Sequence, residues 1–179
     1  EMAEEKIAER IDANLLNIPI QDLTDLPKPM FDKKVTNLSK KTQGQLIIKE
    51  YPTASAHSGH FKTLLNELSL KKSFRPDIIF VDYLNICASS RYKANSGVNS
   101  YSYIKAIAEE LRGLAVEANV PIVSATQTTR SGFASSDVDL TDTSESFGLP
   151  ATADLMFALI STEELEELNQ IMVKQLKNR

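Results

Sequence analysis

The stretch Asp77-Ile78-Ile79-Phe80-Val81-Asp82 decides the fold class, because it places four apolar residues in a row between two carboxylates. An uninterrupted apolar run of this kind is typical of a strand in a parallel sheet that is covered on both faces. We therefore predict a buried strand over residues 77–82, with Asp82 at its carboxyl end.

Similar apolar runs recur along the chain and alternate with helical patterns. Apolar residues at three- and four-residue steps predict a long helix over 104–118, another over 2–16 and one that begins at Ser58. One or two short helices are predicted within 17–44, where three prolines interrupt any longer element. Further strands are predicted at 46–48, 121–125, 155–160 and 171–176. The alternation predicts an α/β fold, a mostly parallel sheet with helices on both faces.

The composition is that of one globular domain with a substantial core. The 179 residues are 42% hydrophobic and 25% charged, and no apolar run approaches the length that spans a bilayer. The single Cys87 excludes an internal disulfide and a cysteine-cluster metal site, and it indicates a reducing, cytoplasmic compartment. The net charge of −4 does not favour nucleic acid, so DNA contact requires local positive charge.

Polar side chains that follow predicted strands are the first candidates for chemistry, because ligands of parallel sheets bind beyond the carboxyl ends of the strands. Asp82 is placed to hold Mg²⁺ of a bound nucleoside triphosphate through water. Gln127, two residues beyond the strand 121–125, is placed to contact a phosphate or an attacking water. Taken singly, each also fits an ordinary polar residue where a strand reaches solvent. His57 and His60 are interpreted as surface or helix-start residues, since no further ligand is near in sequence.

Five motifs in order resemble those of the DnaB-like hexameric replicative DNA helicases, whose core is a RecA-like ATPase domain, and they cover nearly the whole chain. The residues of these motifs most resemble those of the members from T-even-type bacteriophages. The motifs are Glu1-Met2 before a helix, Asp82-Tyr83-Leu84 after a strand, the strand 121–125 with Gln127, Glu145-Ser146 before Ala153-Asp154-Leu155, and Lys177-Asn178-Arg179.

The resemblance implies a role for each matching residue. Glu1 is expected to be the general base, Asp82 the Mg²⁺-binding carboxylate and Gln127 the sensor of the γ-phosphate. Lys177 and Arg179 are expected to reach the ATP of a neighbouring subunit, with Arg179 as an arginine finger. Without the other motifs, Glu1 also fits an acidic residue in the first turn of a helix, and the two cations fit a solvated strand end.

The resemblance further implies that two predicted loops, residues 88–100 and roughly 128–146, line the channel of a six-membered ring and contact single-stranded DNA. Six copies would multiply a modest local charge. Solvated loops remain the alternative for both segments, and the chain departs from the family at Ser144, where many members have Arg. The expected contacts are Arg91, Tyr92, Lys93, Arg130, Ser144, Glu145 and Phe147.

No P-loop is present, because the six glycines never form the Gly-x-x-x-x-Gly-Lys-Ser/Thr pattern. We expect residues 1–179 to be part of a motor domain that is cut at both ends, and a chain that hydrolyses ATP poorly by itself. The expected function is ATP-driven unwinding at a replication fork, with a primase and a helicase loader as partners. A RecA-like recombinase and a non-catalytic scaffold of the same fold remain the alternatives.

Overall fold

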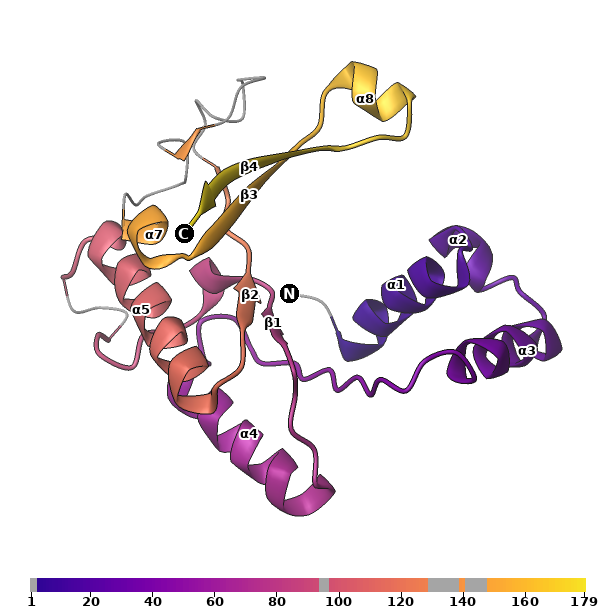
Figure 1. The fold of residues 1–179 in the computed structure, drawn as a ribbon, viewed down its shortest axis with the longest axis horizontal. Coiled ribbons are helices and arrows are strands. Elements are labelled where there is room, and N and C mark those ends of the chain that lie inside the picture. The colour runs from indigo at the N-terminus through magenta and orange to yellow at the C-terminus, as the bar shows by residue number, and fades with distance from the viewer. Residues whose placement is uncertain (1–2, 94–96, 129–138, 141–147) are drawn as a thin grey trace. The chain divides into compact units, whose positions relative to one another are not determined.

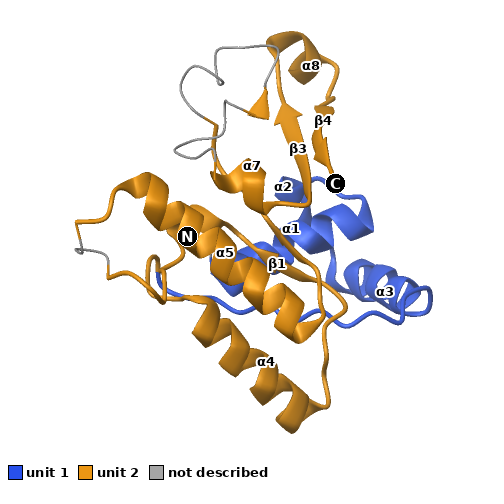
Figure 2. Cartoon of the chain, turned by 60° about the vertical axis from the view of Figure 1, so that its left-hand side comes forward, with its two compact units in different colours: residues 1–52 blue, residues 53–179 orange. Residues whose placement is uncertain are grey.

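The computed structural model of the protein describes residues 3–93, 97–128, 139–140 and 148–179. They form two compact units, residues 1–52 and 53–179, which are coloured separately in Figure 2. Among the helices of these described residues, none has the length and apolar character needed to cross a bilayer.

The first unit contains the predicted amino-terminal helix and two further helices in the segment where one or two short helices were expected. They are α1 (Glu4–Leu16), α2 (Ile20–Leu23) and α3 (Lys28–Ser39). Glu4 and Glu5 lie in the first turn of α1, where carboxylates interact favourably with the helix dipole. Asn17 ends α1 in the left-handed conformation, with φ 52°, and its N–H donates to carbonyls of the last turn.

The predicted strand at 46–48 is wrong, because residues 43–52 contain no helix or strand. Leu46 is 62% exposed, so this apolar segment buries too little surface to hold a strand. The backbone N–H of Glu50 instead donates to Glu4 Oε1 at 2.8 Å, and Lys49 Nζ lies 3.8 Å from the same oxygen. These contacts attach the segment to the start of α1.

The second unit begins with α4 (Ser58–Lys72) and β1 (Ile79–Val81), followed by the short 3₁₀ helix η1 (Leu84–Ile86). The long predicted helix is α5 (Ser100–Ala118), which leads into β2 (Ile122–Ser124). Figure 1 shows α7 (Gly148–Thr152), β3 (Leu155–Ile160), α8 (Glu163–Glu167) and β4 (Met172–Asn178) completing the unit. The helices and the four predicted strands of this unit therefore confirm the α/β pattern.

The strands pair in two separate ways. β1 and β2 are parallel, with Val81 opposite Ser124, as expected for two strands that are joined by a helix. β3 and β4 form an antiparallel hairpin with a register irregularity between Met156 and Phe157. The described residues thus contain one parallel and one antiparallel pair, and the last two predicted strands pair with each other.

The core of the second unit is built on α5. Ile107 is 1% exposed, and Asn99 caps the helix by accepting from the Ser102 N–H at 2.8 Å. Apolar residues from α5, η1 and the start of α7 pack together, namely Leu84, Cys87, Ile104, Ile107, Leu111 and Leu149. The three- and four-residue spacing on α5 therefore does bury one face of the helix, as predicted.

The prediction that both faces of the strand at 77–82 are covered is wrong for the described residues. Phe80 is 70% exposed, and Val123, its partner on β2, is 45% exposed. The neighbouring Val81 instead packs against the core on α5. Successive side chains of a strand point to opposite faces, so the described part of the chain covers one face of this pair.

The start of α4 accounts for the two histidines. His57 caps the helix, its Nδ1 accepting from the Gly59 N–H at 3.0 Å, while the His57 N–H donates to His60 Nδ1 at 3.2 Å. The interpretation of these residues as helix-start histidines is confirmed. Within the described ranges, no group of three or more His, Cys, Asp or Glu side chains is arranged to hold a metal ion.

We predict that Ile107→Ala lowers the free energy of unfolding by about 2–5 kcal/mol, because it leaves a cavity in the core beneath α5. Urea unfolding followed by circular dichroism measures the loss. Val116→Ala is the matched control on the same helix, since Val116 is 74% exposed and its truncation should change stability little. Equal losses for the two variants would contradict this description of the core.

We also predict that Cys87 reacts slowly in the folded protein. Burial raises the pKa of its thiol to about 11, so on the order of one thiol in a thousand is ionised at pH 8. Mass spectrometry of the peptide that contains Cys87 should show slow alkylation by iodoacetamide in buffer and rapid alkylation in urea. Rapid alkylation in buffer would show that the thiol is accessible.

Candidate nucleotide edge and neighbouring loop

The carboxyl ends of β1 and β2 meet, and this places two predicted site residues on one edge. Two hydrogen bonds fix the strand ends, one at the last paired position and one beyond it. Ser124 Oγ donates to the Val81 carbonyl at 2.8 Å, and the Leu84 N–H donates to the Ala125 carbonyl at 3.3 Å. The end of β1, which Asp82 follows, therefore lies beside the end of β2, from which the chain continues to Gln127.

Gln127 contacts the residue that follows Asp82. Its Nε2 donates to the hydroxyl of Tyr83 at 3.2 Å, and both Gln127 and Asp82 are exposed. An exposed carboxylate and an exposed amide at the ends of adjacent parallel strands can both reach a ligand outside the sheet. The sequence predicted these residues separately. In the structure, the hydrogen bond from Gln127 to Tyr83 links Gln127 to the residue next to Asp82.

The residues of this edge fit a nucleotide-bound Mg²⁺ held by few protein ligands. Magnesium keeps several waters and takes one or two carboxylates together with phosphates, which suits a single exposed Asp82. Two further polar atoms nearby, Asn85 Oδ1 and Thr126 Oγ1, are buried without a hydrogen-bond partner in the described structure. Asn85 is in η1 and Thr126 follows β2, so both belong to the segments that leave the two strands at this edge.

The two cations at the end of β4 contact the end of α7 in their own chain. Lys177 Nζ donates to the Pro150 carbonyl at 2.5 Å, and Arg179 Nη2 approaches the Ala151 carbonyl at 3.5 Å. Carbonyls at the end of a helix lack intrahelical donors and attract positive charge. Lys177 and Arg179 therefore lie close together, and both contact carbonyls of the short helix α7.

Asp154 joins this pair to α5. Its carboxylate accepts from Arg112 Nη1 at 2.6 Å and lies 3.7 Å from Arg179 Nη1, while the Arg179 N–H donates to its carbonyl at 3.0 Å. The hydrogen bond from Arg112 is the main reason that the pKa of Asp154 is lowered, and the charge of Arg179 acts in the same direction. Asp154 is thus shared between two guanidinium groups.

The predicted DNA-binding residues of the first loop lie together after η1. Arg91, Tyr92 and Lys93 are exposed, and Arg91 Nη1 forms an ion pair with Glu109 Oε2 at 2.6 Å. Five predicted residues lie outside the described ranges, namely Glu1, Arg130, Ser144, Glu145 and Phe147.

Sequence reasoning missed Glu110, which holds the start of this loop. Its side chain is buried on α5, and its carboxylate accepts hydrogen bonds from Ser89 and Ser90. An acidic residue between the core positions Ile107 and Leu111 of a strongly periodic helix was a usable signal, since buried carboxylates require partners.

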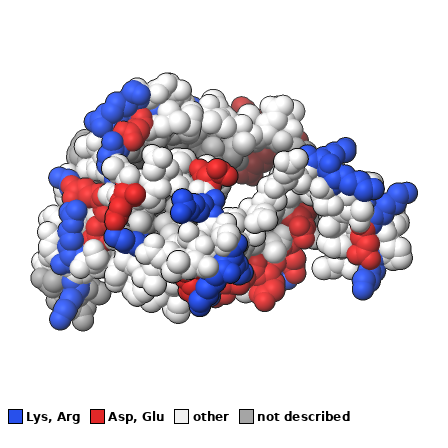
Figure 3. All heavy atoms as spheres, turned by 60° about the horizontal axis from the view of Figure 1, so that its bottom comes forward, with Lys and Arg blue, Asp and Glu red and all other residues white. Residues whose placement is uncertain are grey.

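Charge on the visible surface is mixed rather than gathered. On the face drawn in Figure 3, uncharged side chains cover most of the surface, and basic and acidic side chains lie near one another in several groups. Among the described residues, Lys62 forms an ion pair with Glu117, and Lys71 forms one with Glu67. The expectation that DNA contact depends on local positive charge stays a prediction.

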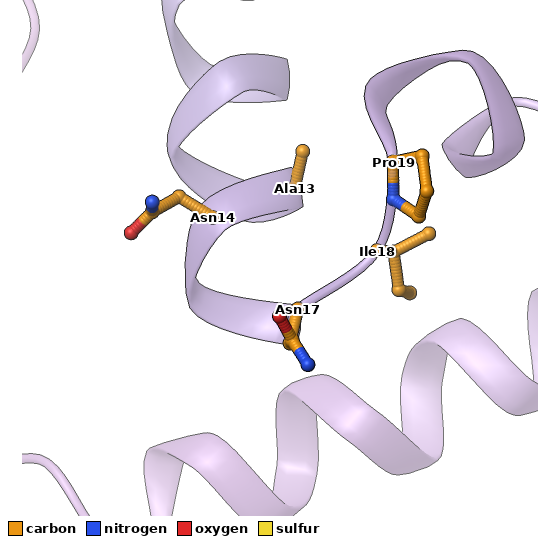
Figure 4. Close-up of a pocket in the computed structure, with 5 residues that line it drawn as sticks. All are labelled: Ala13, Asn14, Asn17, Ile18 and Pro19. Atoms are coloured by element: carbon orange, nitrogen blue, oxygen red, sulfur yellow. The ribbon is translucent and has the colours of Figure 1, made fainter. Parts of the chain in front are cut away.

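A separate hollow in the first unit does not resemble a catalytic site. Figure 4 shows it at the end of α1, where Asn14 points away from the apolar side chains of Ile18 and Pro19. The residues that line it, completed by Ala13 and Asn17, carry no charge. None of the predicted site residues lies there.

Comparisons with known proteins give the family and the fold. A sequence model of the DnaB-like helicase C terminal domain matches residues 1–179. The chain is 50% identical over 182 residues to the DnaB-like replicative helicase of Enterobacteria phage T4, covering all of this chain and 38% of that protein. A probable plasmid replicative DNA helicase of Chlamydia trachomatis is 34% identical over 135 residues, which are 73% of this chain and 27% of that protein.

Two solved structures share the fold over the full chain. One, described as an ATPase domain, has a TM-score of 0.79 at 19% identity, and the match covers 64% of that chain. A DnaB-like replicative helicase described with its interactions with primase has a TM-score of 0.76 at 20% identity, with 44% of that chain covered. The predicted RecA-like α/β class is thereby confirmed. The ordered motifs, the shared edge of β1 and β2 and the match over every residue lead to one conclusion: this chain belongs to the family of the DnaB-like helicase C-terminal domain.

Proposed function

We propose that residues 1–179 are part of the motor domain of a replicative DNA helicase, which uses ATP hydrolysis to move along single-stranded DNA. The main observation behind the proposal is that Asp82 and Gln127 follow adjacent parallel strands at one edge. A hydrogen bond joins Gln127 to Tyr83, the residue after Asp82. Since the chain spans 38% of its phage T4 relative, the activity is proposed for the complete protein. Its site of action would be the host-cell cytoplasm.

At this edge Asp82 would hold Mg²⁺ through water, and Gln127 would contact the γ-phosphate. When bound, Mg²⁺ supplies positive charge that stabilises the phosphate oxygens as the terminal phosphoryl group is transferred. The hydrogen bond from Gln127 to Tyr83 joins the two strand ends, so movement of Gln127 would be transmitted to the segment after Asp82. Glu1 would be the general base.

We further propose that the active form is a ring of six copies in which Lys177 and Arg179 act on ATP held by a neighbouring subunit. A guanidinium supplied in trans would couple hydrolysis to assembly. The contacts of Arg179 with Asp154 and Ala151 are exposed and weak enough to exchange for a phosphate, because surface ion pairs contribute little.

The DNA-contacting surface would be formed by two loops that face the channel of the ring. Arg91, Tyr92 and Lys93 offer two cations and an aromatic ring, the combination that binds phosphates and stacks on bases. Arg130, Ser144, Glu145 and Phe147 would belong to the second loop. Single-stranded DNA, a primase and a helicase loader are the partners that this function requires; one structural neighbour is itself described with primase.

We predict that Asp82→Asn lowers DNA-stimulated ATPase activity of the complete protein about a hundredfold, because it removes the charge that would hold the metal's water. Turnover is measured across a magnesium titration, in which the variant should also need more Mg²⁺. Asp77→Asn is the matched control, since Asp77 is an exposed carboxylate before the same strand. Wild-type turnover by Asp82→Asn would remove Asp82 from the site.

We predict that Arg179→Ala lowers turnover about a thousandfold or more, as expected for an arginine finger. Rings mixed from Arg179→Ala and Asp82→Asn subunits should regain part of the activity, because some interfaces then combine an intact Asp82 with an intact Arg179. Arg75→Ala, another exposed arginine, should behave as wild type.

The mixing experiment also separates the motor from its alternatives. Mixed rings without recovered activity would show that Arg179 does not act in trans. A complete protein without turnover on any nucleotide would favour a scaffold that keeps the fold alone.

A further inference from the structure

Glu110 is an unusual residue for the middle of α5. It is 9% exposed and lies between Ile107 and Leu111, which are 1% and 6% exposed, so a carboxylate takes part in the face that buries the core. Removing a carboxylate from water costs several kcal/mol unless hydrogen bonds replace its hydration. The contacts of Glu110 therefore decide whether it is tolerated.

The carboxylate is satisfied by one short segment of backbone and two hydroxyls. Oε1 accepts from Ser89 Oγ at 2.6 Å, and Oε2 accepts from the Ser90 N–H at 2.8 Å and from Ser58 Oγ at 3.1 Å. The Arg91 N–H also donates to Oε1, at 3.3 Å. Three consecutive residues, 89–91, thus depend on a single side chain of α5.

The protonation state of Glu110 follows from this environment. Burial raises the pKa of the carboxyl, but the hydrogen bonds from Ser89, Ser90 and Ser58 together lower it below its usual value. Glu110 is therefore ionised at neutral pH, and its bonds to the two backbone N–H groups are charge-assisted.

The same segment fixes the beginning of the predicted loop at 88–100, the basic loop, which carries Arg91 and Lys93. Ser89 Oγ accepts from the N–H groups of Arg91 and Tyr92, at 3.1 and 3.3 Å, while it donates to Glu110. The Ser89 N–H in turn donates to the hydroxyl of Tyr103 on α5, at 3.1 Å. The backbone of 89–92 is consequently held against α5, and the side chains of Arg91, Tyr92 and Lys93 extend from this attached base.

We propose that Glu110 is a positioning residue for single-stranded DNA: its buried carboxylate holds residues 89–91 against α5 so that Arg91, Tyr92 and Lys93 are presented in a fixed arrangement. The inference rests on the proposed function, since it assigns the loop to DNA. Preorganisation of this kind improves binding by reducing the entropy that the loop loses on contact. Glu110 touches no DNA and acts through the backbone it orders.

The test compares two glutamates of α5 in the complete protein. Glu110→Gln replaces one acceptor oxygen by an NH₂ group that faces N–H donors, and thereby disrupts the anchor. Glu117→Gln is the matched control: it makes the same charge change on the same helix, and Glu117 also contacts α4, through Lys62. Ser89→Ala is a milder second variant, which removes one bond to Glu110 without altering α5.

The first measurement follows the loop without DNA. Trypsin cleaves after Arg91 and Lys93, and cleavage there should be about tenfold faster in Glu110→Gln than in the wild type, with Ser89→Ala between them and Glu117→Gln unchanged. Wild-type cleavage rates in both Glu110→Gln and Ser89→Ala would overturn the inference, whatever the DNA titration shows.

The second measurement titrates single-stranded oligothymidylate against ATPase turnover. For Glu110→Gln the half-saturating DNA concentration should rise about five- to tenfold, while turnover at saturating DNA stays within about twofold of wild type. A fall in maximal turnover at unchanged half-saturation would show a merely structural role and overturn the inference.

A double variant, Arg91→Ala with Lys93→Ala, separates this inference from the proposal on which it rests. Weaker DNA binding by the double variant with wild-type binding by Glu110→Gln would refute only the positioning role. Wild-type DNA binding by the double variant would refute the assignment of the loop to DNA, and the positioning role would fall with it.

Discussion

The parallel pairing of β1 with β2 is the constraint on which the candidate site depends. Three paired positions fix the register. The bond from Ser124 to Val81 strengthens the last of them, and the bond from Leu84 to Ala125 extends the contact beyond it. A register shift of one residue would move the end of β2 by about 3 Å along β1 and so separate Gln127 from Tyr83. The chemistry proposed for Asp82 and Gln127 therefore rests on backbone pairing more than on any side-chain contact between them.

The long helix and the adjacent strand ends could be predicted from the sequence because their signals are local. The apolar spacing of α5 and the run 77–82 each act over a few residues, and the crossover rule brings β1 and β2 together. The segment 46–48 was predicted as a strand on the same kind of signal, but apolar character alone does not provide a pairing partner. The exposure of Phe80 likewise depends on what covers a strand, which its own sequence does not specify.

The arrangement of the polar groups could be predicted only in part. The ordered motifs identified Asp82, Gln127, Lys177 and Arg179, yet no periodicity indicates that Arg179 contacts Asp154, because that contact joins the two ends of the β3–β4 hairpin. Glu110 was missed for the opposite reason. Its signal was local, an acidic residue on a core face, but its meaning depends on Ser58, Ser89 and Ser90, which lie 20 to 52 residues away.

The position of Arg112 adds a mechanical consequence to the structure of α5. Arg112 and Glu110 are two residues apart, which on an α-helix places them about 200° apart around the axis and only about 3 Å apart along it. One residue holds the backbone of the basic loop, and the other holds Asp154 beside Arg179. The two attachments therefore lie on opposite sides of one stiff helix. The attachment to the loop is buried, whereas the attachment to Asp154 is an exposed ion pair that can exchange.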